Sequence, residues 1–228
     1  RGDGLQLGLI RQVGRIVRQV ARQQRPGGRG RQGRHHQALD LGRRVEAALS
    51  APEVDGVVVT HGTDTLEESA YLLDLTLNSP KPTVVTGPMR PATQLGYDGI
   101  VNLAGAIRVA ATPEARGLGV LVVFGGQIFA ASEAQKIHSQ QLDAFGAPGS
   151  GPLGRIEGEQ VLLRHRPQQR LYIPCSRLEE QVDLITIAQG ASERQLRHAI
   201  EDGLAGVVLA AFGGGRVQVQ RMVGGVAR

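Results

Sequence analysis

The chain has 228 residues, which is enough to bury a sizeable core in one or two domains. Aromatic residues make up only 3% and Trp is absent, so Val, Leu, Ile and Ala must fill that core. A single cysteine, Cys175, excludes an internal disulfide and a metal site made of cysteines alone. No apolar run approaches the roughly 20 residues that a membrane-spanning helix needs.

The formal net charge of +5 comes from the N-terminal part of the chain, where residues 1–34 carry nine arginines and one acid, Asp3. Apolar residues from Leu5 to Val20 keep a loose helical period, and a Gly-, Arg- and Gln-rich run follows. We expect residues 1–40 to be an atypical basic low-complexity segment, poorly ordered over 21–36. A nucleic-acid arm is the less frequent explanation, because no aromatic residue is interleaved for base stacking. We therefore predict no nucleic-acid partner and no membrane contact.

From residue 41 onwards, short β-branched apolar runs alternate with stretches of helical period. We expect helices at 41–49, 66–77 and 99–111, and strands at 56–60, 82–86 and 118–124. This alternation predicts an α/β fold with a parallel, doubly wound sheet of the flavodoxin or Rossmann kind over residues 41–160.

The remaining chain repeats the pattern on a smaller scale. Residues 161–181 lose strong periodicity and are expected to form a linker. Residues 182–228 are expected to form a partial C-terminal α/β domain, with strands at 182–188 and 206–211. Between these strands, a capping box of Ser192 and Gln195 predicts a helix to about Asp202.

The most informative stretch is the sequence HGTDT at residues 61–65, which lies between a predicted buried strand and a predicted helix. Thr65 and Glu68 have the spacing of a capping box, so the helix is expected to begin there. Ligands of open α/β sheets bind at such turns, and free N–H groups at a helix start favour a carboxylate. On position alone, a simple helix cap is the more frequent explanation.

The HGTDT motif closely resembles the second active-site motif of bacterial-type L-asparaginases, the asparaginase/glutaminase family. The resemblance covers roughly residues 41 to 215, in the order and spacing that the family has. It continues at residues 85–91 (VTGPMRP), 98–103 (DGIVNL), 127–131 (QIFAA) with Lys136 five residues on, and 151–154 (GPLG).

Amide hydrolysis needs a nucleophile, a base that activates it and donors for the oxyanion. The resemblance implies that Thr63, Lys136 and Asp64 form the family's second catalytic triad, with Thr63 and Asp64 also binding the substrate and Asp64 pairing with its α-ammonium group. Lys136 is one of only two lysines, and a lysine, unlike an arginine, can accept a proton. The other lysine, Lys81, is expected in solvent, and His61 is expected to be hydrogen-bonded structure. No metal or cofactor is expected.

The sequence therefore predicts an L-asparagine amidohydrolase that releases aspartate and ammonia through a threonine acyl-enzyme, with L-glutamine as a second candidate substrate. The family's homotetramers imply a homo-oligomer, weakened here because most of the family's C-terminal domain is not recognised. The alternative is a catalytically impaired relic or ligand-binding module, since the family's Gly-Gly-Thr-Ile-like turn with its first nucleophilic threonine is not found. We expect a cytoplasmic protein, and the periplasm is the alternative compartment.

Overall fold

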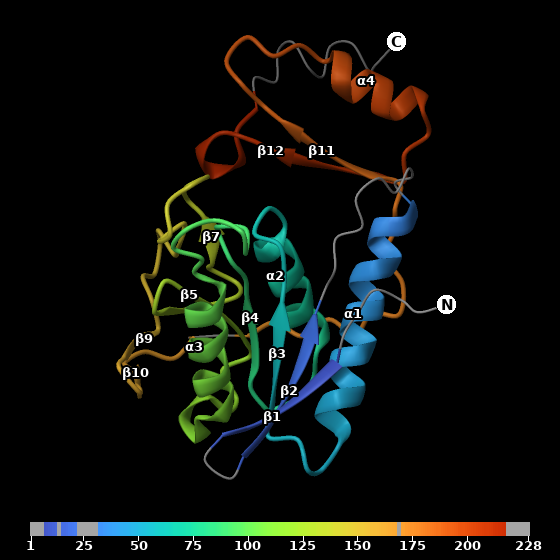
Figure 1. The fold of residues 1–228 in the computed structure, drawn as a ribbon. Helices are drawn as coiled ribbons and strands as arrows, with labels where there is room; N and C mark the ends of the chain where they lie inside the picture. The colour runs from blue at the N-terminus through green and yellow to red at the C-terminus, as the bar shows by residue number, and fades with distance from the viewer. Residues whose placement is uncertain (1–6, 13–14, 22–31, 168–169, 218–228) are drawn as a thin grey trace. The chain divides into compact units, whose positions relative to one another are not determined.

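The computed structural model describes residues 7–12, 15–21, 32–167 and 170–217 (Figure 1). The chain forms two compact units, Arg1–Ser176 and Arg177–Arg228. Among the described helices, none combines the length and the apolar character needed to cross a membrane.

Unit 1 is built on an eight-stranded mixed sheet. Its four middle strands, β2 to β5, pair in parallel, and the strands on either side of them pair antiparallel. In spatial order the strands are β1 (Leu7–Gln12), β2 (Arg15–Ala21), β3 (Gly56–Thr60), β4 (Thr83–Thr86), β5 (Val120–Phe124), β6 (Gln127–Ala130), β9 (Gly154–Glu157) and β10 (Gln160–Leu163).

Helices cover both faces of this sheet, so the middle strands are buried on both faces (Figure 1). Val57 and Val59 pack in one core, together with α1 (Gln32–Ser50) and α2 (Leu66–Thr76). Val58 points the other way and packs in a second core with α3 (Gly99–Ala111). Unit 1 is therefore an α/β fold, as the alternation of strands and helices predicts. The short helix η1 (Pro113–Ala115) leads from α3 toward β5.

The start of the chain differs from the sequence-based expectation. The loose helical period before residue 21 was misleading, because β1 and β2 form an antiparallel pair and β2 continues the sheet beside β3. Pairing with a neighbouring strand overrides a weak local pattern. Residues 22–31, most of the stretch 21–36 that we expected to be poorly ordered, lie outside the described residues. From Gln32 onwards the chain is helical, so α1 begins earlier than predicted.

Unit 2 is a small β-α-β arrangement made of β11 (Val182–Thr186), α4 (Arg194–Glu201) and β12 (Gly206–Ala210), followed by η2 (Gly213–Gly215). The two strands pair in parallel, and Ile185, Ile187 and Ala199 form its buried cluster. The predicted capping box is wrong, because α4 has Glu193 as its N-cap and the described chain provides no side-chain capping bond there.

Lys81 lies partly buried and holds the end of α1, contrary to the expectation that it is solvated. Its Nζ donates hydrogen bonds of 2.7 Å to the main-chain oxygens of Leu49 and Ala51. A lysine at a helix C-terminus satisfies unpaired carbonyls and interacts favourably with the helix dipole. The loop between α2 and β4 is thereby fastened to α1.

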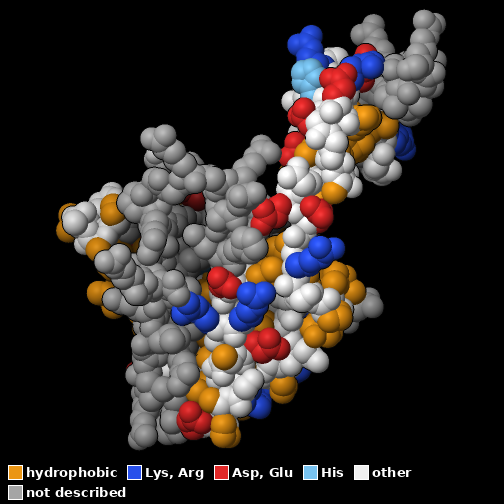
Figure 2. All heavy atoms as spheres, turned by 90° about the vertical axis from the view of Figure 1, so that its right-hand side faces the viewer, with side chains coloured by type: hydrophobic (Ala, Val, Ile, Leu, Met, Phe, Trp, Pro, Cys, Tyr) orange, Lys and Arg blue, Asp and Glu red, His pale blue; other side chains and the backbone are white. Residues whose placement is uncertain are grey.

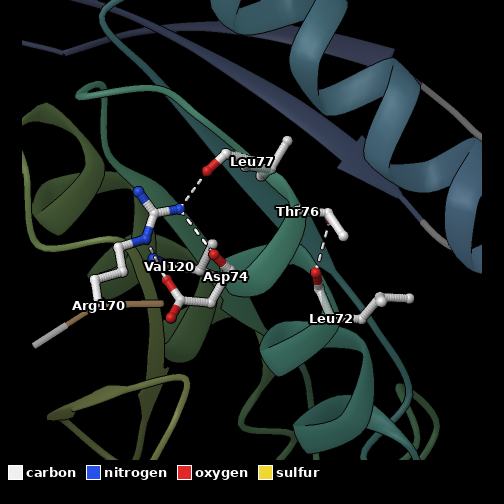
Figure 3. A network of polar contacts seen from close by, with 6 residues as sticks. All are labelled: Leu72, Asp74, Thr76, Leu77, Val120 and Arg170. Atoms are coloured by element: carbon white, nitrogen blue, oxygen red, sulfur yellow. Dashed lines mark hydrogen bonds and ion pairs between the residues drawn. The ribbon is translucent and has the colours of Figure 1, made fainter. Parts of the chain in front are cut away.

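The segment that we expected to be a linker begins with β10 and then returns to α2, where Arg170 binds the helix end (Figure 3). The Arg170 guanidinium donates to Asp74 Oδ1 at 3.0 Å, to the Asp74 main-chain oxygen at 2.9 Å and to the Leu77 oxygen. Asp74 Oδ1 also accepts the N–H of Val120, the first residue of β5, at 2.8 Å. The Asp74 side chain is only 9% exposed. One buried carboxylate therefore joins α2, β5 and the segment after β10.

An ion pair on the surface of unit 1 is much more exposed to solvent than the pair of Asp74 and Arg170. Arg43 and Asp40 on α1 are 2.9 Å apart, and their side chains are 64% and 54% exposed. On the face drawn in Figure 2, the described acidic and basic side chains are interspersed rather than separated by sign. Water and salt screen such pairs, so they contribute little to stability.

We predict that Asp74→Ala lowers the free energy of unfolding by about 3 kcal/mol, because it removes the carboxylate partner of Arg170 Nε and the acceptor of the buried Val120 N–H. The matched control, Asp40→Ala, removes the exposed pair and should cost about 0.5 kcal/mol or less. Urea unfolding followed by circular dichroism measures both values. Equal losses in the two variants would show that the Asp74 network does not stabilise the fold.

Candidate active site

The turn between β3 and α2 carries Thr63 and Asp64 at the carboxyl end of a parallel strand. The His61 N–H donates to the Thr86 oxygen at 2.9 Å, which extends the pairing of β3 and β4 by one residue. His61 is buried, and its Nδ1 lies 2.7 Å from the Gly62 oxygen. His61 thus has the hydrogen-bonded, structural surroundings that we expected.

Thr65 is the N-cap residue of α2, as predicted, but the capping box is wrong. Within the described chain, the Thr65 hydroxyl makes no capping hydrogen bond. The Thr65 backbone explains this, because its ψ of 24° lies outside the β region that capping residues normally adopt.

Lys136 reaches this turn by an indirect route. After β5, glycines 125 and 126 turn the chain with positive φ, and β6 runs back antiparallel to β5. The next segment forms a separate two-stranded sheet of β7 (Gln135–Lys136) and β8 (Phe145–Gly146). Phe145 packs against Phe124 with ring centroids 4.7 Å apart, in the same core as α2. This packing brings β7 to the α2 side of the sheet.

The structure brings Thr63, Asp64 and Lys136 together. The Lys136 Nζ lies 3.1 Å from Thr63 Oγ1 and 2.9 Å from Asp64 Oδ1, both within hydrogen-bond range. The Lys136 side chain is 18% exposed and that of Asp64 is 82% exposed, so the hydroxyl and amine meet beside an open carboxylate. A hollow of about 260 Å³ adjoins them, lined by Asp64, Lys136, Ile137, His138 and Ser139.

A second polar group, made of two residues of the DGIVNL motif to which the sequence analysis gave no role, holds the neighbouring loops. The Asp98 carboxylate accepts the Met89 N–H at 3.0 Å and the Asn102 side-chain amide at 2.9 Å. The same Asn102 amide group donates to the Gly87 oxygen at 3.0 Å, and its oxygen accepts the Gly125 N–H at 3.2 Å. The loops after β4 and β5 are therefore bound to the start of α3. The sequence signal for this role was the spacing of Asp98, at the N-cap, and Asn102, in the first turn of the apolar helix α3.

In the part of the chain that the structure describes, no group of three or more His, Cys, Asp or Glu side chains is placed to hold a metal ion. The chemistry available at Thr63 is that of a hydroxyl with an amine in contact.

Comparison with known proteins identifies the family. Residues 9–169 match the family described as "Asparaginase, N-terminal". This chain belongs to the asparaginase family. The match includes β2 and the start of α1, which lie in the segment that we expected to be atypical.

Named relatives of this asparaginase-family chain cover it well but are longer. It is 36% identical over 184 residues to an L-asparaginase of Bacillus licheniformis, covering 81% of this chain and 57% of the relative. It is 45% identical over 127 residues to a glutaminase-asparaginase of Pseudomonas fluorescens biotype A, covering 55% and 35%. It is 34% identical over 190 residues to a probable periplasmic L-asparaginase of Haemophilus influenzae, covering 81% and 54%. The chain spans about half the length of the curated relatives it matches.

We predict that Gly87→Ala destabilises the loop beside the site, because the new Cβ would lie 2.1 Å from the His61 oxygen. Hydrogen bonds hold both backbones, from the His61 N–H to Thr86 and from the Asn102 amide to the Gly87 oxygen, so the expected cost is about 2 kcal/mol of unfolding free energy. Gly42→Ala in helix α1 is the control, since the new Cβ would meet only Leu73 Cδ2, at 3.8 Å. That change should stabilise the protein by about 0.5–1 kcal/mol. Urea unfolding distinguishes the two, and a Gly87→Ala variant as stable as wild type would contradict the close approach.

Proposed function

We propose that this chain hydrolyses the side-chain amide of L-asparagine to L-aspartate and ammonia, with L-glutamine as an alternative substrate. Thr63 is the nucleophile, Lys136 accepts its proton, and Asp64 orients Lys136 and binds the substrate ammonium. The observation that supports this most directly is the position of the Lys136 Nζ, 3.1 Å from Thr63 Oγ1 and 2.9 Å from Asp64 Oδ1. Membership of a family whose relatives are named L-asparaginases supports the substrate.

The proposed reaction has two steps. Thr63 Oγ1 attacks the amide carbon while its proton passes to the Lys136 Nζ. The carbon–nitrogen bond then breaks as the departing nitrogen takes up the proton held by the Lys136 Nζ. Ammonia is released, and the acyl group remains as an ester on Thr63. Water attacks this ester, which releases the product carboxylate and restores the threonine hydroxyl.

Asp64 has two partners in this scheme. Its Oδ1 accepts a hydrogen bond from the Lys136 Nζ at 2.9 Å, which holds that amine beside Thr63 Oγ1. Because the Asp64 side chain is largely exposed and lines the hollow, a substrate ammonium can pair with it from the solvent side. Such a substrate would compete with Lys136 for the carboxylate.

Thr63→Ala should abolish ammonia release from L-asparagine, because it removes the attacking oxygen. Lys136→Arg keeps a positive charge but cannot accept a proton, so kcat should fall by about 10²–10⁴-fold. Thr65→Ala is the matched control: the same atoms are removed two residues away, and both activity and stability should stay close to wild type. A coupled ammonia assay measures all three variants. If Thr63→Ala and Thr65→Ala lose activity equally, the motif is structural and the proposed function is wrong.

A second candidate is ligand binding without turnover, favoured because the sequence contains no Gly-Gly-Thr-Ile-like turn to supply the family's first threonine. Calorimetry with L-aspartate distinguishes the two functions. Binding that is lost in Asp64→Asn, in a chain that releases no ammonia, would identify a binding module. We further propose that the chain assembles into a homo-oligomer, and light scattering of the purified chain tests this.

A further inference from the structure

Glu67 contacts the candidate site from the first turn of α2. Its carboxylate Oε2 accepts the main-chain N–H of Lys136. The two residues are 69 positions apart in the sequence, so this bond joins α2 to the segment that carries the lysine. Residues 63–67 therefore bind Lys136 at both ends: Thr63 and Asp64 bind its side chain, and Glu67 binds its main chain.

The main chain at Lys136 has only a small sheet of its own. Within the described chain, β7 and β8 form a separate two-stranded sheet of two residues each, outside the eight-stranded sheet. The next residue, Ile137, donates its N–H to the Ala144 oxygen at 2.7 Å, which lengthens this pairing slightly. Such a short hairpin is marginal by itself. The bond to Glu67 fastens it to a helix that packs in the main core.

The hydrogen bond from the Lys136 main chain distinguishes Glu67 from its neighbour Glu68. Both carboxylates lie in the first turn of α2, where they interact favourably with the helix dipole. A carboxylate that accepts a main-chain N–H makes a charge-assisted bond, roughly twice as strong as a neutral one. If only negative charge at the helix start matters, removal of either carboxylate should have the same effect. If Glu67 positions Lys136, removal of Glu67 alone should affect the site.

We infer that Glu67 is a positioning residue, which sets the distance between the Lys136 Nζ and Thr63 Oγ1 by fixing the Lys136 main chain. This inference rests on the proposed function, in which that distance governs proton transfer. A displacement of about 1 Å at a reacting group can cost about 10²-fold in rate. Because Glu67 acts through Lys136, its loss should lower kcat and leave KM nearly unchanged.

Ammonia release from L-asparagine by three variants tests this role. Glu67→Ala should lower kcat by about ten- to hundredfold at nearly constant KM. Glu67→Gln should retain most of the activity, because its amide oxygen can still accept the N–H. Glu68→Ala is the matched control for charge at the helix start and should remain close to wild type. In a Lys136→Arg background, Glu67→Ala should cause little further loss, because both changes affect one group. A loss in Glu68→Ala equal to that in Glu67→Ala, or a change confined to KM, would overturn the inference.

A second measurement does not depend on turnover. The chain has two lysines, Lys81 and Lys136, so ¹⁵N-lysine labelling gives two amide signals, which Lys81→Arg assigns. The Lys136 amide should exchange with deuterated water at least about tenfold faster in Glu67→Ala than in wild type or Glu67→Gln, with Lys81 unchanged. An unchanged Lys136 rate would overturn the inference even in an active enzyme. A wild-type chain that releases no ammonia, but whose Lys136 amide responds in this way, would contradict the proposed function alone.

Discussion

Parallel pairing of β3, β4 and β5 is the constraint on which the site depends. Val58 pairs with Val84 and Val84 with Leu121, so the three strands run side by side in one direction. Because parallel strands end at a common edge, the turn after β3 and the loops after β4 and β5 must meet there. The strands can be so apolar because helices cover both faces.

Two buried polar groups hold β5 at its two ends. The Asp74 carboxylate accepts the N–H of Val120, where β5 begins, and the Asn102 side chain accepts the N–H of Gly125, just after it ends. Each group also binds a different segment, Arg170 in the first case and the Asp98 carboxylate in the second. A buried polar side chain is costly unless its hydrogen bonds are satisfied, so each such group favours one arrangement of the strands and loops around it.

The three candidate catalytic side chains are held in place by different structural elements. Thr63 and Asp64 lie in a short turn whose position follows from β3 and α2, whereas Lys136 comes from a small hairpin outside the main sheet. The packing of Phe145 on Phe124 and the bond from Glu67 hold that hairpin against α2. The precision of the site therefore depends more on the support of Lys136 than on the HGTDT turn.

The sequence by itself determined the middle of unit 1, since β3 and α3 lie where their apolar patterns predict them and the HGTDT turn lies between β3 and α2. It also selected Thr63, Asp64 and Lys136 as a group, through the family motifs. Only the tertiary structure decided that residues 7–12 and 15–21 form strands, that Lys81 binds the C-terminal end of α1, and that Glu67 binds the Lys136 main chain. The physical reason is distance along the chain: periodicity and turn chemistry report on near neighbours, whereas these contacts join segments that only folding brings together.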